Sequence, residues 1–353
     1  MVIPHKNKWI FWGQLVITWT VAFLILSFLR NYGWPETEGF TPQFYNAPGL
    51  SLTLGIVVGT FYFLIELIMN RRRFRRMSFG QWAGVKSLFH FALILLLFVL
   101  VVLLYPLFSG TDSLGVPIRE LLFSKSFLLI LFYFSLVSLL ITIFMLANQQ
   151  LGRGILSNQL LGRYHHPREE ERIFLFIDLR GSTTIAEKLG HFRFSRLIQD
   201  CFADITDAVI KHEAEIYQYV GDEVILCWKS KSGLKRNNCI EAFLHFMEIL
   251  ARRSDYYQNT YGLQPEFEAG AHVGRMMVAE VGIIKRELAY LGDVLNTAAR
   301  IQGRCNTVGE SFLISETLHA ALETPERYAS KRFSSLELTG KEEKMTLVAI
   351  QRP

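Results

Sequence analysis

Cysteine is scarce in this chain, and the few copies exclude one kind of site. The four cysteines all fall in the second half of the sequence, and no two of them have CxxC spacing. A thiolate metal site needs such clustering, so none is indicated. We expect four reduced thiols: Cys201, Cys227, Cys239 and Cys305.

Charge is nearly absent from four long stretches in the first half of the chain. These apolar runs cover 9–29, 50–69, 87–108 and 121–147. Each is long enough to cross a hydrocarbon core of about 30 Å as a helix. A soluble helix rarely stays apolar on all faces for so long, so the sequence predicts four transmembrane helices. The first run is long and no small-residue cleavage site follows it, so we do not expect it to be a signal peptide.

Lysine and arginine are also scarce in two of the loops between these runs. The loops 30–49 and 109–120 carry only Arg30 and Arg119, whereas a basic cluster at 71–76 follows the second run. Cytoplasmic loops carry the excess of basic residues. We therefore expect a multi-pass protein of the cell (inner) membrane, embedded in the lipid bilayer, with both termini and the second half cytoplasmic. Because the net charge of +5 comes largely from these flanks, it gives no reason to expect a nucleic acid partner.

Two ionisable residues, Glu66 and His90, lie within the apolar runs. Such groups are candidate functional sites. Both lie near cytoplasmic ends, which favours snorkelling or pairing with the basic cluster. With few polar groups inside the runs and no helices broken by Gly or Pro, a transporter or channel path is not favoured.

Hydrophobicity falls and charge rises between the two halves. We therefore divide the chain into a membrane domain (1–147), a linker (148–172) and a cytoplasmic domain (173–353). One stripe of a linker helix that pairs with its copy in a dimer can be formed by Leu151, Ile155, Leu156, Leu160 and Leu161, although three glycines in this segment weaken the helix.

Two acidic residues of the second half follow strand-like segments. A β-favouring run at 173–177 ends on Asp178, and Asp222 lies in a tight turn between strands at 215–220 and 224–228. Taken singly, each aspartate fits a helix cap or a turn. Together at one sheet edge they suit hard divalent cations. The turn Gly181-Ser182-Thr183 opens a helix, with hydroxyl N-cap candidates and N–H groups for phosphate.

The remaining periodicities complete an α+β order. Helices are expected at 192–213, 237–261 and 293–305, and strands at 267–273, 276–281, 312–314 and 345–350, with a turn at Gly274. This order, β-α-β-β-α-β with extra strands, predicts a ferredoxin-like core. Its sheet should be largely antiparallel with helices on one face.

A second set of polar residues lies near the end of the chain. Asn296 and Arg300 are four residues apart, so they project from one face of the 293–305 helix. An amide beside a guanidinium suits a phosphoryl group that gains charge during reaction. Arg275 and Lys341 are further cations at strand ends, and each alone also fits a solvated charge.

The motifs together resemble the catalytic domain of class III nucleotide cyclases. They are Phe176-Ile177-Asp178-Leu179-Arg180-Gly181-Ser182-Thr183, Val220-Gly221-Asp222-Glu223, Ala271-His272-Val273-Gly274-Arg275 and Gly292-Asp293-Val294-Leu295-Asn296-Thr297-Ala298-Ala299-Arg300. The resemblance implies an enzyme that converts a nucleoside triphosphate to a cyclic nucleotide and pyrophosphate for signal transduction. It also implies a homodimer in which one subunit supplies the metal carboxylates and the other the Asn/Arg helix.

The same resemblance implies a role for each matching residue. Asp178 and Asp222, with the Leu179 carbonyl, would hold two Mg²⁺ or Mn²⁺ ions. Asn296 would orient the ribose, and Arg300 would stabilise charge on the α-phosphate. The phosphate-binding set would be Gly181, Ser182, Thr183, Arg275 and Lys341.

The base pocket departs from the family. Adenylate cyclases of this class usually carry Lys at the position of Gln218 and Asp or Thr at that of Ala289, while guanylate cyclases carry Glu and Cys. Gln218 can donate or accept and Ala289 does neither. The interpretation favours ATP, with GTP or a pyrimidine triphosphate as alternatives.

Two rival classes remain at this point. The Val220-Gly221-Asp222-Glu223-Val224 hairpin is also faintly similar to that of diguanylate cyclases, but that family has no place for the Asn296/Arg300 helix. The other rival is a membrane receptor whose cyclase-like domain has lost activity. Loss usually removes a metal aspartate or the Asn/Arg pair, and all four are present here.

Overall fold

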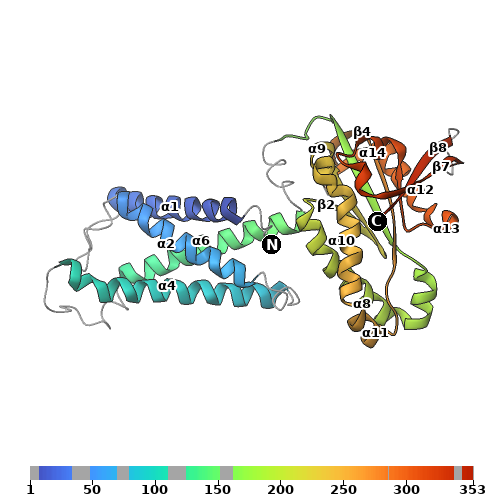
Figure 1. The fold of residues 1–353 in the computed structure, drawn as a ribbon. Helices are drawn as coiled ribbons and strands as arrows, with labels where there is room; N and C mark the ends of the chain where they lie inside the picture. The colour runs from blue at the N-terminus through green and yellow to red at the C-terminus, as the bar shows by residue number, and fades with distance from the viewer. Residues whose placement is uncertain are drawn as a thin grey trace. The chain divides into compact units, whose positions relative to one another are not determined.

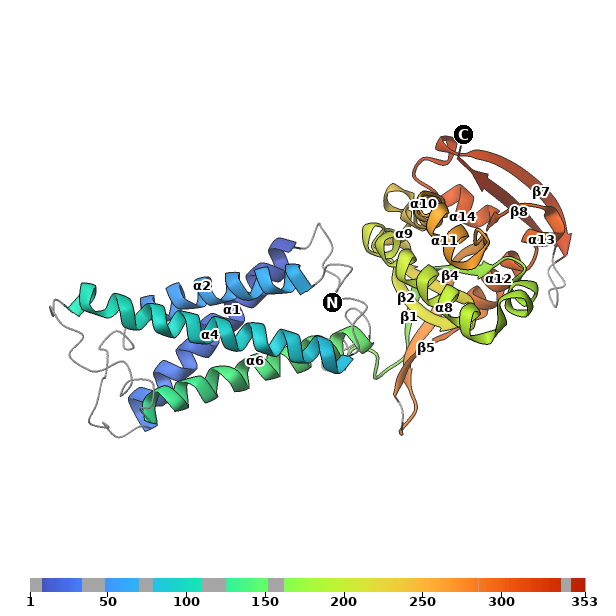
Figure 2. The same cartoon turned by 90° about the horizontal axis from the view of Figure 1, so that it is seen from below.

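A computed structural model describes residues 8–33, 48–69, 79–109, 125–151, 162–284, 286–337 and 344–352. The chain forms two compact units, Met1–Gln150 and Leu151–Pro353, whose elements are labelled in Figures 1 and 2. The four apolar runs lie in the first unit, and the carboxylate, amide and guanidinium candidates lie in the second. Most of the predicted linker helix, 152–161, lies outside the described residues.

The first unit is helical. Its helices are α1 (Lys8–Gly33), α2 (Pro48–Met69), α4 (Phe79–Ser109) and α6 (Lys125–Leu151). Two stretches, Lys8–Leu29 and Ser51–Met69, are long and apolar enough to cross a membrane, and α6 has a shorter apolar stretch, Leu131–Met145. Among the described residues, therefore, two helices meet the criterion for a membrane span, rather than the expected four.

Helices α1 and α2 pack closely because of two glycines. A Cβ at Gly55 would lie 2.1 Å from the Thr20 Oγ1, and one at Gly59 would lie 2.7 Å from the Val16 Cα. Small residues spaced in this way let helix backbones approach in an apolar environment. Any side chain at either glycine would force the two helices apart.

Glu66 and His90 are buried, at 3% and 2% exposed, so the expectation of snorkelling is wrong. Glu66 of α2 forms an ion pair with the buried Lys86 of α4. The His90 ring stacks on Tyr62, with centroids 3.6 Å apart. The basic cluster after the second run lies outside the described residues, so Lys86 is the cation seen here. Glu66 and His90 therefore belong to a polar cluster between helices α2 and α4.

The second unit is built on one eight-stranded sheet, with strand order β2-β3-β1-β4-β6-β8-β7 and β5 paired to β4. The strands are β1 (Arg168–Leu179), β2 (Glu215–Val220), β3 (Glu223–Lys229), β4 (Phe267–Val281), β5 (Glu287–Leu291), β6 (Phe312–Ser315), β7 (Ala329–Glu337) and β8 (Lys344–Gln351). All neighbours are antiparallel except β4 and β6. The predicted α+β class and the β2–β3 hairpin are confirmed.

Helices cover both faces of this sheet, which corrects the expectation of one face. The helices are α8 (Ser182–Lys211), α9 (Ser230–Leu234), α10 (Asn238–Arg252), α11 (Ser254–Tyr261), α12 (Asp293–Gln302), α13 (Cys305–Val308) and α14 (Glu316–Ala321), with 3₁₀ turns at Lys235–Asn237 and Pro325–Arg327. Ile173, Leu175 and Ile177 share a core with α8 and α10. Phe174 and Phe176 point the other way and share a core with α12. Alternation along β1 therefore supplies both cores.

Strand β4 is continuous, so the turn expected at Gly274 is wrong. A Cβ at Gly274 would lie 2.8 Å from the Val294 Cγ2, and a Cβ at Gly270 would lie 2.2 Å from the Gln302 N. Both glycines are required because α12 lies directly on β4. Glycine at position 274 therefore reflects the close packing of α12 on the strand and not a change in chain direction.

Three element boundaries also differ from expectation. Strand β1 begins at Arg168, within the segment assigned to the linker, because residues 168–179 pair with β4 along their whole length. Helix α8 begins at Ser182 and kinks at Gly190, which has φ 72°. The single helix expected over 237–261 breaks near Arg253 into α10 and α11.

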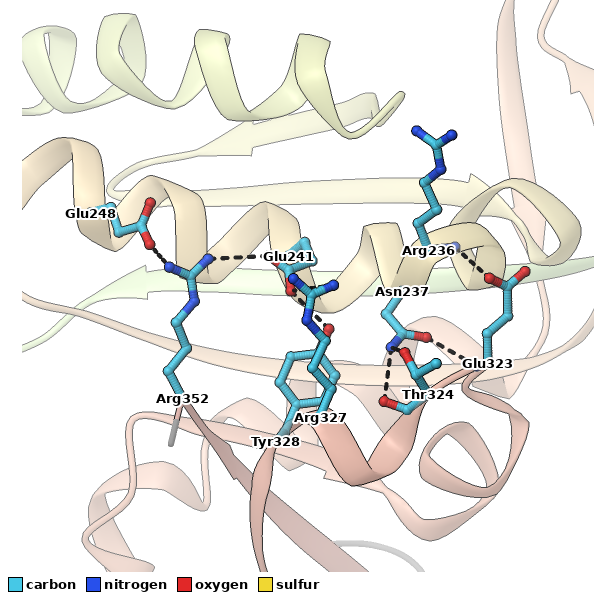
Figure 3. A network of polar contacts seen from close by, with 9 residues as sticks. All are labelled: Arg236, Asn237, Glu241, Glu248, Glu323, Thr324, Arg327, Tyr328 and Arg352. Carbon is cyan, nitrogen blue, oxygen red and sulfur yellow. Dashed lines mark hydrogen bonds and ion pairs between the residues drawn. The ribbon is translucent and has the colours of Figure 1, made fainter.

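Polar contacts tie the C-terminal elements to α10, as Figure 3 shows. Glu241 of α10 accepts hydrogen bonds from the Tyr328 hydroxyl (2.9 Å) and from the Arg352 guanidinium (3.1 Å). Asn237, just before α10, donates to the Thr324 Oγ1 at 2.8 Å. These bonds hold the β7–β8 edge against the helical layer.

Candidate active site

Asp178 and Asp222 meet at one end of the sheet. Asp178 is the penultimate residue of β1, and Asp222 lies in the two-residue turn between β2 and β3. Gly221 forms the other half of that turn with φ 61°, a conformation that favours glycine. The pairing of Ile177 with Val224 brings the turn beside Asp178. The pairing of β1 with β3 therefore places Asp178 and Asp222 at the same end of the sheet, as the sequence predicted.

The electrostatics of this pair favour a bound cation. Burial, together with the neighbouring Asp222 carboxylate, raises the pKa of Asp178 to about 6. Burial and the same two aspartates raise the pKa of Glu223 to about 7. The Asp222 Oδ2 is buried without a hydrogen-bond partner among the described residues. Like charges held together and an unsatisfied oxygen are what a divalent cation would relieve.

The donor set fits magnesium or manganese. The described residues contain no group of three or more His, Cys, Asp or Glu placed to hold a metal. Two carboxylates are sufficient for Mg²⁺, which usually keeps waters and takes its other ligands from substrate phosphates. The Asp178 Oδ1 already accepts a hydrogen bond from the Leu179 N–H (3.0 Å), which fixes the carboxylate next to the Leu179 main chain.

The turn after β1 presents a helix N-terminus beside these carboxylates. Gly181, with φ 65°, is the N-cap of α8, and no side chain caps the helix. The expected hydroxyl cap is therefore wrong, because Ser182 and Thr183 are already the first helical residues. Their N–H groups belong to the first turn, where they have no partner within the helix and are oriented to bind anions.

Arg180 and Glu268 support this turn. The sequence motifs include Arg180 and Glu223 without assigning them a role, and they do not include Glu268. The Arg180 Nε lies 3.2 Å from Glu268, and its N–H donates to the Glu266 carbonyl at 2.9 Å. Glu268 is buried and opposite Asp178 in the β1–β4 register. Its alternation with Phe267 and Ala269 could have placed Glu268 on the face of Asp178.

Helix α12 presents Asn296 and Arg300 on a common side. Val294, Ala298 and Ile301 are its buried apolar face, whereas Asn296 is exposed and Arg300 half-buried. The structure thus gathers the two aspartates at one sheet end and the amide with the guanidinium on one helix. That Asn296 and Arg300 of one subunit face Asp178 and Asp222 of another stays a prediction.

The remaining predicted residues are Lys341, Arg275, Gln218 and Ala289. Lys341 is outside the described residues. Arg275 is exposed, and its register partner on β1 is Glu171. It lies seven residues along β4 from Glu268, the register partner of Asp178, which is a distance of about 23 Å along the strand. Gln218 is exposed on β2, and Ala289 lies on β5 opposite Ala279.

Comparison with known proteins assigns the second unit. The family model for the adenylate and guanylate cyclase catalytic domain matches residues 165–351. "Adenylate cyclase 2" of Rhizobium meliloti (strain 1021) is 34% identical over 57% of this chain and 55% of that protein. "Adenylate cyclase" of Anabaena cylindrica is 24% identical over 50% of this chain and 36% of that protein. The chain therefore spans about half, or less, of the length of these relatives.

Solved structures show the same fold. A bacterial light-regulated adenylyl cyclase superposes with a TM-score of 0.55 and 18% identity, covering 65% of this chain and 67% of that chain. The candidate site, with Asp178, Asp222 and the Asn296/Arg300 pair of α12, therefore lies within the matched cyclase domain. The chain belongs to the adenylate and guanylate cyclase family, and its second unit is the catalytic domain.

Proposed function

We propose that this protein is a membrane-bound, homodimeric adenylate cyclase, which converts ATP to 3′,5′-cyclic AMP and pyrophosphate. The observation that carries the proposal is the close pair Asp178 and Asp222, whose like charges and unsatisfied oxygen favour a bound cation. The Asn296/Arg300 helix in the same domain supplies the second half of the chemistry.

Asp178 and Asp222, with the Leu179 carbonyl, would hold two Mg²⁺ or Mn²⁺ ions. When bound, such ions lower the pKa of the ribose 3′-hydroxyl and neutralise the triphosphate. The N–H groups at Gly181, Ser182 and Thr183 would bind phosphate oxygens.

The helix α12 would act on the reacting atoms. Asn296 would hold the ribose so that its 3′-oxygen lies in line with the α-phosphorus. Arg300 would stabilise the negative charge that develops there as the new P–O bond forms, the bond to pyrophosphate breaks and the hydroxyl proton leaves to solvent. In the family arrangement, α12 of one subunit serves the carboxylates of the other, so two subunits would form two composite sites. Arg275 lies far from its own Asp178, so it would contact phosphate only in the site built on the other subunit's carboxylates. Lys341 would be a further phosphate contact.

Membrane attachment would come from four helices, two of which meet the span criterion here. The basic residues flanking them favour cytoplasmic termini and a cytoplasmic catalytic domain. ATP is preferred as substrate because the relatives named above are adenylate cyclases. Gln218 can donate to or accept from either purine, so it does not by itself select the base.

The first test is turnover by the full-length protein in detergent with Mn²⁺ and each of the four nucleoside triphosphates. We expect cyclic AMP and pyrophosphate in equal amounts, with ATP the best substrate. Absence of cyclic product from all four would refute the enzyme assignment, and a preference for GTP would refute the base assignment alone.

The second test addresses the composite site. Full-length Asp178→Ala and Arg300→Ala should each be inactive as homodimers. Co-expressed with different affinity tags and purified as heterodimers, they should regain activity, because one of the two sites then has both halves intact. Heterodimers without activity would show that each site lies within one chain.

A further inference from the structure

Arg172 is an arginine buried at the centre of the sheet, only 2% exposed. Its Nε donates to the Glu170 Oε2 (2.9 Å), and its Nη1 donates to the Glu215 Oε2 (2.8 Å). Its guanidinium also lies over the Tyr290 ring, 5.2 Å from the centroid. One side chain on β1 therefore contacts the first residue of β2 and the penultimate residue of β5.

These contacts join two strands that are not neighbours. In the sheet order, β3, β1 and β4 lie between β2 and β5. The two strands nevertheless meet over the α12 face, where the Tyr217 and Tyr290 rings pack edge to face with centroids 5.2 Å apart. Phe174 packs against both rings, at 5.9 and 5.4 Å. Arg172, next to Phe174 on this face of β1, supplies the charged part of the same junction.

The two joined strands carry the base-pocket candidates. Gln218 directly follows Tyr217 on β2, and Ala289 directly precedes Tyr290 on β5. Neither Gln218 nor Ala289 is charged, so neither can select a base through a long-range electrostatic interaction. Selection then depends on where the Gln218 amide and the main chain around Ala289 are held, and hydrogen-bond selection of this kind is sensitive to small displacements.

We propose that Arg172 is a positioning residue for base recognition, which holds β2 through Glu215 and β5 through Tyr290 at the separation that fits the substrate base. The inference rests on the proposed cyclase function and extends it to a residue that does not touch the nucleotide. Arginine suits the role because its planar group can pair with two carboxylates and stack on an aromatic ring at once, which a lysine ammonium does not do.

The test is Arg172→Lys in the full-length protein, with steady-state kinetics for ATP and GTP in Mn²⁺. Lysine keeps the positive charge beside Glu170 and Glu215. It loses the planar guanidinium that bonds both carboxylates at once and the contact with the face of the Tyr290 ring. We expect the KM for ATP to rise about tenfold while kcat changes less than about threefold, because the reacting groups lie elsewhere. The ratio of kcat/KM for ATP over GTP should fall by a similar factor.

Arg253 provides a matched control on the other side of the domain. It forms an ion pair with the buried Asp204 and lies over the Tyr256 ring at 4.2 Å, so Arg253→Lys loses the same kinds of contact. Both variants should lower the unfolding midpoint, but Arg253→Lys should keep the wild-type KM and base ratio. Equal kinetic changes in both variants would overturn the proposal, because general destabilisation would then explain them.

A second variant covers the case in which Arg172→Lys does not fold. Tyr290→Leu removes the stacked ring and leaves the ion pairs of Arg172 intact, and it should raise the KM for ATP and lower the base ratio in the same way. Wild-type KM and base ratio in either folded variant would overturn the proposal. A wild-type protein that turns over no triphosphate would instead refute the proposed function, so the two failures are distinct.

Discussion

Replacing Asp222 with asparagine should make the metal-free protein more stable while removing its activity. The pKa of Asp178 is about 6, against an ordinary value of 3.8, because of burial and the adjacent Asp222 carboxylate. That difference corresponds to at most about 3 kcal/mol of unfavourable free energy when Asp178 is ionised. Burial is the larger cause, so we expect Asp222→Asn to recover about 1 kcal/mol, or about 2–4 °C in the unfolding midpoint.

The pH dependence has a definite sign. A carboxylate whose pKa is higher in the folded state binds more protons folded than unfolded, so stability falls as pH rises. For Asp178 this cost is absent below about pH 3.8, grows between about pH 3.8 and 6, and is complete above about pH 6. The metal-free wild type should therefore gain stability from acidification between neutral pH and about pH 5. Asp222→Asn should gain less, because part of the repulsion is already gone.

Thermal unfolding of the full-length protein, with EDTA or with saturating Mn²⁺, measures these effects. Mn²⁺ should raise the midpoint of the wild type and have little effect on Asp222→Asn. Asp204→Asn is the control of opposite sign, since Asp204 is paired with Arg253 and accepts from the Tyr257 hydroxyl (2.7 Å). It should lose stability at neutral pH. The reasoning is refuted if Asp222→Asn is destabilised like Asp204→Asn, or if Mn²⁺ stabilises it as it does the wild type.

Two further substitutions test the packing of each unit. Gly270→Ala should displace α12, because its Cβ would lie 2.2 Å from the Gln302 N, and cyclase activity should fall at least about tenfold. Gly303→Ala, whose nearest neighbour would be 3.7 Å away, should stay active, and equal loss in both would contradict the packing account. In the first unit, Glu66→Gln should cost about 3–5 kcal/mol, measured by chemical unfolding in detergent, because it leaves the Lys86 charge buried and unpaired. Removing that charge as well, in Glu66→Gln with Lys86→Met, should restore most of the loss; if the double variant is no better, the ion pair is not the cause.

The residues of the candidate site were found from short patterns in the sequence. A strand that ends on Asp178, a glycine turn at Asp222 and the four-residue spacing of Asn296 and Arg300 are each local features. Backbone preferences and side-chain periodicity act over a few residues, so they can be read directly. The same patterns led to the catalytic family, which the match over 165–351 confirmed.

Tertiary structure alone decided the features that depend on distant segments. Gly274 looks like a turn residue in the sequence, but it is small because α12 lies on it, and only the packed structure shows that helix there. Glu66 and His90 were expected to snorkel or to pair with the basic cluster, whereas Glu66 pairs with Lys86 of another helix and His90 stacks on Tyr62.

Arg172 shows the same limit most clearly. In the sequence it ends a charged run that reads as linker, although its alternation with Phe174 could have placed it on a core face. Its carboxylate Glu215 lies 43 residues away along the chain, and its aromatic neighbour Tyr290 lies farther still. The sequence by itself thus determined which groups the protein carries and their local conformation. Burial, charge pairing and the pKa of Asp178 were determined by long-range contacts, because those properties depend on what surrounds a group in space.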